Sequence, residues 1–447
     1  SPEFNVQFNP ICMEPPPIWR RFYGVTEKKV DVEMTYEEAL TGIHSRRTFS
    51  GGGATLDRIH RLMAALGDPQ EQLRVVHIAG TNGKGSVSAM TAAALRACGY
   101  HVGLFTSPYL VDFRERIRLD GENISKEALV SCYETVMAAE TTLEKAGCEP
   151  VNEFELVTAI GFLAFAQAKL DYVVLEVGLG GRTDPTNLIA HPAACCITSI
   201  SLDHTAILGH TLEAIAGEKA GIIKPGVPVV AARQKPEVYG VLVRRAEELG
   251  APLCPAPDVK PLQQNQHGTR FLCGNTELLI PLLGDYQMEN AAAAWQLCRV
   301  LGLPEEPVTE GLRQVSWPGR LQYLPGTPDY LIDAGHNPGG IAALCRTLET
   351  LFPERNITAV VSMMKDKDYA SCIPMIARHA SHVIGCTVGL PRSLAPEEIA
   401  KAASACCPSN AADTMESALA LAGQDTGNLI LVCGSVFGAG EALRLLG

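Results

Sequence analysis

The fold is decided by residues 75–86, VVHIAGTNGKGS, together with the apolar run that follows them. Val75 to Ala79 is short and mostly apolar, which predicts a buried strand. Gly80-Thr81-Asn82-Gly83-Lys84-Gly85-Ser86 is rich in glycine and predicts a tight loop, and Val87 to Cys98 predicts a helix. A strand, a glycine loop and a helix in this order begin an α/β unit.

The loop from Gly80 to Ser86 predicts a binding site for the phosphates of a nucleotide. Its glycines allow backbone N–H groups to turn toward phosphate oxygens, and the N-terminus of the next helix adds partial positive charge. Lys84 supplies a full charge for the outer phosphates, and Ser86 supplies a hydroxyl for phosphate or Mg²⁺. An ordinary glycine-rich turn is the alternative, but Gly-Lys-Gly-Ser between a strand and a helix favours nucleotide binding.

Apolar runs elsewhere predict that this unit belongs to an α/β protein. Several of them lack polar–apolar alternation, which suits a parallel sheet covered on both faces. The fold class is therefore an N-terminal P-loop ATPase domain with a mostly parallel sheet, plus a smaller C-terminal α/β domain of Rossmann-like type. Strands are predicted at 101–105, 172–177, 195–200, 330–332, 359–362 and 429–433, short antiparallel strands within 253–283, and helices at 36–44, 56–66, 154–168, 290–301 and 341–351.

The length of 447 residues predicts two domains. Residues 1–33 are Pro-rich and begin with Ser-Pro-Glu-Phe, which resembles a remnant of cloning, so we expect them to be an extension outside the fold. Gly51-Gly52-Gly53 predicts a flexible loop. We expect an ATP-binding domain at 34–302, a linker at 303–307 (Leu-Pro-Glu-Glu-Pro) and a C-terminal domain at 308–447.

The amino-acid composition argues against several classes of binding partner and several kinds of site. The net charge of -12 argues against nucleic acid or an anionic membrane surface as a main partner. The 15 cysteines are scattered without a C-x-x-C pair, which favours a reducing, cytoplasmic setting over a disulfide framework or a zinc site. No apolar run approaches the ~18 residues of a membrane span.

Two residues predict a metal site near the loop. Glu176 follows four apolar residues at the end of a predicted strand, where a carboxylate is costly unless it binds a metal or a cation. Ser107 follows another predicted strand, so its hydroxyl can reach the same edge of the sheet. The alternatives are a carboxylate at the sheet edge and an ordinary Ser-Pro turn.

His204 and Lys219 predict further chemistry. His204 lies just past a predicted strand and beside Asp203, where a ligand would bind in an α/β sheet, although a structural histidine is equally compatible. Lys219 falls on the apolar face of a helix, in register with Leu212 and Ile215. Burial lowers the pKa of a lysine, and a neutral amine can pair with a charge, act as a base or form a carbamate. The alternative is a lysine that extends along the core edge to water.

These segments together resemble the folylpolyglutamate synthase and dihydrofolate synthase family of the Mur ligase superfamily, from about Met34 to the C-terminus. Three positions differ from the commonest family pattern: Tyr109, Pro185 and the order Ala334-Gly335. The motifs that carry the resemblance are Ile78 to Ser86, Thr106-Ser107-Pro108-Tyr109-Leu110, Glu115-Arg116-Ile117, Phe154-Glu155, Leu175 to Arg182, Leu202-Asp203-His204-Thr205, Glu218 to Lys224, Gly319-Arg320 and Asp333-Ala334-Gly335-His336-Asn337-Pro338.

The resemblance implies roles for individual residues. It implies two Mg²⁺ ions, the first held by Ser107 and Glu176 and the second by His204, with Lys219 carbamylated. Lys84, Lys219 and His336 would be the catalytic residues. It further implies ATP contacts from Gln287, Asn290, Arg320 and Asp333, and glutamate contacts from His336 and, more weakly, Ser435.

The implied activity is an ATP-dependent ligase of folate biosynthesis that adds L-glutamate to a folate or dihydropteroate carboxylate through an acyl phosphate. The family resemblance also implies a monomer. Two alternatives stay open: a Mur-type ligase acting on another carboxylate, and an ATP-binding switch without ligase activity. Neither the preferred acceptor nor its glutamate chain length follows from the sequence.

Overall fold

The computed structural model describes residues 34–47 and 55–447, and residues 36–447 form one compact unit. The predicted extension at 1–33 and the predicted loop at 51–53 lie outside the described residues. The first helices are α1 (Tyr36–His44) and α2 (Asp57–Ala65), as predicted within one residue at each end. Within the described ranges, every helix is too short or too polar to cross a membrane.

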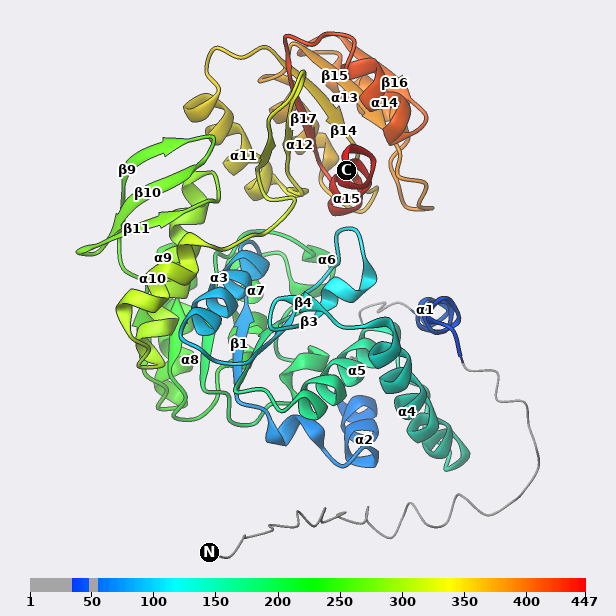
Figure 1. The fold of residues 1–447 in the computed structure, drawn as a ribbon, viewed down its shortest axis with the longest axis vertical. Coiled ribbons are helices and arrows are strands. Elements are labelled where there is room, and N and C mark those ends of the chain that lie inside the picture. The colour runs from blue at the N-terminus through cyan, green and yellow to red at the C-terminus, as the bar shows by residue number, and fades with distance from the viewer. Residues whose placement is uncertain (1–33, 48–54) are drawn as a thin grey trace, which may run out of the picture. The chain divides into compact units, whose positions relative to one another are not determined.

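The first sheet has eight strands in the order β4-β3-β2-β5-β1-β6-β7-β8 (Figure 1). Strands β2, β5, β1, β6, β7 and β8 are parallel, while the short β3 and β4 run antiparallel at one edge. The mostly parallel sheet predicted for this half is therefore confirmed. Its strands are β1 (Val75–Ala79), β2 (Val102–Phe105), β3 (Ile117–Leu119), β4 (Glu122–Asn123), β5 (Tyr172–Glu176), β6 (Ala194–Ile197), β7 (Val229–Ala231) and β8 (Leu253–Pro255).

Helices cover both faces of this sheet because its strands are apolar on both. Side chains such as Val76 and Ile78 of β1 pack into one core with α3 (Lys84–Ala97), α9 (Asp285–Val300) and α10 (Glu305–Arg313). On the other face, Cys195 and Ile197 of β6 pack with α7 (Leu212–Lys219) and α8 (Pro236–Glu248). The remaining helices of this half are α4 (Lys126–Lys145), α5 (Glu153–Ala168) and α6 (Thr205–Leu208).

The strand order brings four loops to one edge. Strands β2, β5, β1 and β6 are consecutive neighbours in the sheet and parallel, so their carboxyl ends lie side by side. The segments that follow them begin with Thr106, Val177, Gly80 and Thr198. In open α/β sheets, ligands bind at this edge.

The second sheet has six strands in the order β12-β13-β17-β14-β15-β16, all parallel except β12. It confirms the predicted C-terminal α/β domain. Figure 1 shows its helices on both faces. The elements are β12 (Gln322–Leu324), β13 (Asp329–Ile332), α11 (Pro338–Leu351), β14 (Ile357–Val361), α12 (Tyr369–Ala377), β15 (His382–Cys386), α13 (Pro396–Ala403), β16 (Ser409–Ala412), α14 (Met415–Ala422), β17 (Leu429–Cys433) and α15 (Val436–Leu446).

Part of the prediction for residues 253–283 is wrong. Residues 253–255 form β8, which pairs in parallel with β7 at the edge of the first sheet. The antiparallel strands are β9 (Val259–Asn265), β10 (Gly268–Cys273) and β11 (Thr276–Ile280), which form a separate three-stranded sheet. A three-residue edge strand carries no periodicity that would separate it from the hairpins after it.

The predicted linker at 303–307 coincides with the start of α10. Val308 and Leu312 of α10 are buried in the same core as α3, whereas Leu321 is buried in the core of the second sheet. We therefore propose that the boundary between the two domains lies at 316–320, after Val315. The prolines of the earlier segment mark the start of a helix, with Pro304 as its N-cap, and not a domain boundary.

Candidate active site

The glycine loop is held against the segment that follows β6. The N–H groups of Thr81 and Asn82 both donate to the Ser199 carbonyl, at 2.9 and 3.2 Å, and the Thr198 hydroxyl donates to the Asn82 carbonyl at 2.7 Å. Gly83 has φ +86°, and a side chain there would collide with the Asn290 amide, so this position requires glycine. The neighbouring strand end thus fixes the shape of the loop before any ligand arrives.

Helix α3 begins at Lys84, three residues earlier than predicted. Gly83 in the left-handed conformation is its N-cap, so Lys84 and Ser86 lie in the first helical turn. The Lys84 Nζ donates to the Thr81 carbonyl at 3.2 Å and lines the cavity above the loop. The unpaired N–H groups of this turn and the lysine face the same space, which suits a phosphate group.

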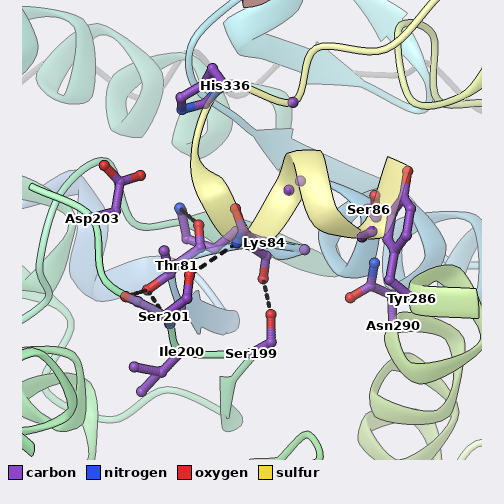
Figure 2. A pocket seen from close by; sticks show the side chains of 18 of the residues that line it. Thr81, Lys84, Ser86, Ser199, Ile200, Ser201, Asp203, Tyr286, Asn290 and His336 are labelled. Atoms are coloured by element: carbon purple, nitrogen blue, oxygen red, sulfur yellow. Dashed lines mark hydrogen bonds between the residues drawn. The ribbon is translucent and has the colours of Figure 1, made fainter. Parts of the chain in front are cut away.

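A first cavity of about 460 Å³ lies over the loop and has two distinct ends. In Figure 2, Tyr286 and Asn290 lie beside Ser86 at one end, and Asp203 and His336 lie at the other, with Lys84 between them. The C-terminal domain contributes Arg320, Asp333 and His336 to the lining. The cavity therefore lies between residues of both domains, as a nucleotide site closed by the second domain would.

The residues outside the glycine loop that were predicted to contact ATP do not all line the first cavity. Asn290, Arg320 and Asp333 line the cavity. Gln287 is fully buried outside the lining, and its amide donates to the Ser86 hydroxyl at 3.3 Å and accepts from Asn290 at 2.9 Å. Gln287 thus positions Ser86 and Asn290, and contact with the nucleotide through its own amide stays a prediction.

Asp333 is buried and shapes the turn that carries His336. Its carboxylate accepts from the Leu321 and Gly335 N–H groups at 3.0 and 2.8 Å. Burial raises its pKa, which the charge of Arg320 and these hydrogen bonds oppose. The turn therefore holds its shape in spite of the reversed Ala334-Gly335 order.

Glu176 and Ser107 lie together, as the metal-site prediction required. The Ser107 N–H donates to the Glu176 carboxylate at 3.0 Å, and both residues line the first cavity. Burial raises the pKa of Glu176, with the charge of Lys84 opposing the shift. Among the described residues, no basic side chain forms an ion pair with Glu176, so a buried carboxylate oxygen and a hydroxyl face the cavity, a donor set that suits Mg²⁺.

His204 lies at the other side of the same cavity. Its φ of +49° is unusual for a residue other than glycine, and such strain concentrates at functional sites. Burial lowers its pKa, which keeps the imidazole neutral and able to bind a metal. Nowhere in the described ranges do three His, Cys, Asp or Glu side chains form a metal-binding group, so ligation at His204 would need help from other donors.

Lys219 occupies the buried face of α7, as predicted. It is 4% exposed, and its Nζ donates to the Gly80 carbonyl at 2.8 Å, directly beneath the glycine loop. Burial and then the charge of Lys84 lower its pKa to about 7. A large share of Lys219 is therefore a neutral amine near pH 7, and the alternative in which its head reaches open water is wrong.

Asp203 joins the two domains. Its carboxylate pairs with the Lys367 Nζ at 3.0 Å and accepts from the Asn337 amide at 3.0 Å, while Asn337 also donates to the Asn82 side chain at 3.0 Å. Burial would raise the pKa of Asp203, but the charge of Lys367 and the hydrogen bond from Asn337 oppose it, and the pKa lies well below its usual value. Asp203 is thus an anion that fixes Lys367 beside His204.

His336 is held by its own turn. Its Nδ1 lies 3.0 Å from the Ala334 carbonyl, so the neutral ring donates through Nδ1 and leaves Nε2 as an acceptor. Burial, followed by the charge of Lys367, lowers its pKa to about 4. The imidazole therefore stays neutral at physiological pH and can accept a hydrogen bond from an amine.

A second cavity of about 490 Å³ adjoins the first. Ser107, His204 and His336 line both cavities, so they mark the junction. Ser435 lines only the second cavity, where its hydroxyl caps α15 by accepting from the Gly438 N–H at 3.4 Å. The N-terminal side of this cavity contributes apolar groups such as Phe154 and charged groups such as Arg116, and the C-terminal side contributes the basic side chains of Lys367 and Arg392.

Several residues of these cavities escaped the sequence analysis. Tyr286 is one residue before Gln287, and a wider view of the Gln-x-x-Asn segment would have included it. Lys367 and Arg392 lie on the C-terminal wall of the second cavity, in loops with no recognisable spacing. Only the Lys-Asp-Lys-Asp charge pattern around Lys367 sets that residue apart in the sequence.

Two family models match the chain. Residues 78–298 match the Mur ligase middle domain, and residues 319–436 match the Mur ligase, glutamate ligase domain. The matched ranges cover the first sheet with its glycine loop, apart from the first three residues of β1, and every strand of the second sheet.

Curated relatives and a solved structure agree with these matches. The chain is 38% identical to the folylpolyglutamate synthase of Lacticaseibacillus casei over 81% of this chain and 87% of the relative. It is 37% identical to the dihydrofolate synthase/folylpolyglutamate synthase of Bacillus subtilis over 80% and 86%. The folylpolyglutamate synthase of Mycobacterium tuberculosis complexed with ADP and AMPPCP superposes with a TM-score of 0.85 at 32% identity, covering 92% of this chain and 98% of that one.

Proposed function

Since the chain belongs to the folylpolyglutamate and dihydrofolate synthases of the Mur ligase family, we propose that it uses ATP to join L-glutamate to a folate or dihydropteroate carboxylate. It is an acid–amino-acid ligase with ATP as a co-substrate. A carboxylate is a poor electrophile, so transfer of the γ-phosphoryl group would first convert it to an acyl phosphate. The amino group of glutamate would then displace phosphate and form the amide.

The observation that carries this proposal is the junction of the two cavities at Ser107, His204 and His336. A nucleotide in the first cavity, with its base toward Tyr286 and its phosphates over Lys84, would direct its last phosphate at this junction. The acid and the amino acid would meet it there from the second cavity. In phosphoryl transfer, much of the rate acceleration comes from holding the reactants in a fixed geometry.

Residues of the first cavity would stabilise the negative charge that shifts as the γ-phosphoryl group is transferred. Lys84 and the N–H groups of the α3 N-terminus would bind the phosphates, with Ser86 kept in place by Gln287. When bound, two Mg²⁺ ions would neutralise phosphate charge, one at Ser107 and Glu176 and the other at His204 with carbamylated Lys219. The low pKa of Lys219 supports the carbamate, because only a neutral amine reacts with carbon dioxide.

The C-terminal wall would receive glutamate. Lys367 and Arg392 supply positive charge for its two carboxylates, and the N-terminus of α15 behind Ser435 adds partial positive charge. His336 Nε2 would accept a hydrogen bond from the attacking amine and so orient it. With a pKa of about 4, His336 is too weak a base to remove a proton from an ammonium group.

Phosphate release measured with ATP, glutamate and either dihydropteroate or a reduced folate tests the proposal, and mass spectrometry identifies the product. We expect phosphate release only when acid and glutamate are both present. A ligase for a different acid would give no product with either pterin, and an ATP-binding switch would bind ATP without glutamate-dependent phosphate release. We also propose that the chain acts as a monomer, which sedimentation measures.

A further inference from the structure

Within the described part of the chain, Arg116 brings an unpaired cation to the second cavity. Its side chain lines that cavity, and its buried Nε has no hydrogen-bond partner among the described residues. Among residues 34–47 and 55–447, no carboxylate lies within ion-pair distance of its guanidinium. A desolvated guanidinium with unused donors is unfavourable by itself, so its retention beside a cavity indicates a ligand that supplies acceptors.

Two aromatic rings hold the Arg116 guanidinium in place. Its Cζ lies 5.3 Å from the ring centre of Tyr109 and 5.5 Å from that of Phe113. The two rings contact each other edge to face at 5.6 Å, so they form one support. Cation–π contacts hold the flat faces of a guanidinium and leave its N–H edges available, which preorganises it for bidentate binding of a carboxylate.

The backbone fixes Arg116 close to the cavity junction. The Arg116 carbonyl accepts from the Thr106 N–H at 3.1 Å, one residue before Ser107. Arg116 and Ser107 also line the same cavity, which places the guanidinium near the same strand ends. Its ligand is therefore expected beside the carboxylate that reacts.

We propose that Arg116 is a specificity residue that binds a second carboxylate of the acceptor, the α-carboxylate next to the reacting γ-carboxylate of a terminal glutamate. This inference rests on the proposed function. An acceptor that already carries glutamate has both carboxylates on one short chain, whereas dihydropteroate has only its reacting benzoate carboxylate. Arg116 thus favours chain extension over the first addition of glutamate.

The test compares three acceptors: tetrahydrofolate, an analogue with 4-aminobutyrate in place of glutamate, and dihydropteroate. The analogue keeps the reacting carboxylate and lacks only the α-carboxylate. In the unchanged protein we expect kcat/KM to be at least about tenfold higher for tetrahydrofolate than for the analogue, the effect of one charge-assisted hydrogen-bonded pair. Arg116→Met should remove this preference through KM, and Arg116→Lys should restore only part of it.

Arg118→Met is the matched control. Arg118 lies two residues further along, and its Nε is also buried without a hydrogen-bond partner among the described residues. Its guanidinium lies over the Trp317 ring, but its side chain lines cavities other than the first and the second. We expect Arg118→Met to leave the ratio between acceptors unchanged, and thermal unfolding of both variants reports whether they fold. Dihydropteroate should react with Arg116→Met within threefold of its rate with the unchanged protein.

The inference is overturned if Arg116→Met affects all three acceptors equally or none, or if the unchanged protein adds glutamate to dihydropteroate but extends no acceptor that already carries glutamate. Equilibrium binding of tetrahydrofolate and its analogue in the presence of AMPPCP gives the same comparison without turnover. Loss of discrimination in binding supports the role of Arg116 even when no ligation occurs. Absence of ligation in the unchanged protein with all acceptors instead contradicts the proposed function.

Discussion

The two adjoining cavities are constructed in different ways. The floor of the first is a glycine loop held by backbone hydrogen bonds to the next strand end of the same sheet. The C-terminal domain closes the first cavity and forms one wall of the second. It contacts the N-terminal domain through side chains: Asp203, which lines the first cavity, binds Asn337 and also Lys367, which lines the second. Nucleotide binding should therefore survive changes that disturb the contact between domains, whereas ligation should not.

Lys219→Ala should cause the largest loss of activity among these variants. It tests the carbamate proposed for Lys219 in the first cavity. We expect kcat/KM to fall about 1000-fold, as for loss of a group that stabilises transition-state charge, while ATP still binds. Short-chain carboxylic acids added to the assay should restore part of the activity by replacing the carbamate. Full activity of the variant without additive would exclude that role.

The control for Lys219→Ala is Lys224→Ala. Lys224 lies one turn beyond α7 and donates to the Asn187 carbonyl at 3.4 Å, away from both cavities. Its loss should change kcat/KM less than threefold, which a steady-state phosphate assay measures.

Lys367→Met removes an ion pair between the domains and should leave the glycine loop of the first cavity intact. It leaves Asp203 buried without its cation, a change that costs about 2–3 kcal/mol and lowers kcat/KM with glutamate by roughly 30- to 100-fold. The affinity for ATP, measured by calorimetry, should change less than threefold. Lys365→Met, at an exposed lysine two residues earlier, is the control, and equal losses in both variants would disprove a specific role for the bridge.

Gly83→Ala disturbs the first cavity alone. The new side chain would collide with the Asn290 amide at φ +86°, so we expect ATP affinity to fall about tenfold, or ~1.4 kcal/mol. Gly99→Ala is matched, because Gly99 has φ +87° and open space around it. Both variants should lose similar stability from backbone strain, and a similar loss of ATP affinity in both would show that strain alone is responsible.

The smallest expected effect is the contribution of His336 to the pH dependence of the free energy of unfolding. Its pKa is about 4 in the folded chain and near its usual 6.5 when unfolded, so the unfolded chain binds more protons between these values. Stability should therefore fall as pH drops from 6.5 to 4, with about 1 kcal/mol from this residue because it keeps some exposure. Thermal unfolding of the unchanged chain and His336→Gln should converge at pH 4; a constant difference from pH 7 to 4 would contradict this.

The buried His77 provides an internal reference for that measurement. Its pKa is lowered to about 3 by burial, and it contacts Thr186 within the first sheet. It titrates in both proteins and cancels from the difference. The difference that remains reports on His336 at the junction of the two cavities.

Local patterns were sufficient for much of the fold. The strand Val75–Ala79 and the strand Leu429–Cys433 have the predicted bounds, because continuous apolar runs between loops have few other possible structures. The patterns failed at helix starts: α3 and α9 begin three and five residues before the predicted starts, at Lys84 and Asp285. Polar and glycine residues there serve the cavity, so they hide the apolar periodicity on which the prediction depended.

The residues of the candidate site also fall into two groups: those that the sequence pattern places together and those that only the fold brings into contact. Glu176, Ser107 and the loop from Gly80 to Ser86 each follow a strand of a parallel sheet, and their convergence could be inferred once those strands were assigned. Asp203 and Lys367 are 164 positions apart and meet only because the second domain faces the first. No spacing in the chain encodes that contact.

The sequence alone determined the glycine loop, the parallel sheets, the placement of Lys219 on the apolar face of a helix and the family resemblance, because each depends on short-range periodicity or ordered motifs. The tertiary structure decided that Lys219 is buried, that two cavities meet at Ser107, His204 and His336, and that Gln287 holds Ser86 in place. It also decided that Arg116 lines the second cavity with no hydrogen-bond partner for its Nε among the described residues. The physical reason is that burial, pKa and the lack of a partner depend on every neighbour in space. Those neighbours come from segments that local sequence patterns do not relate.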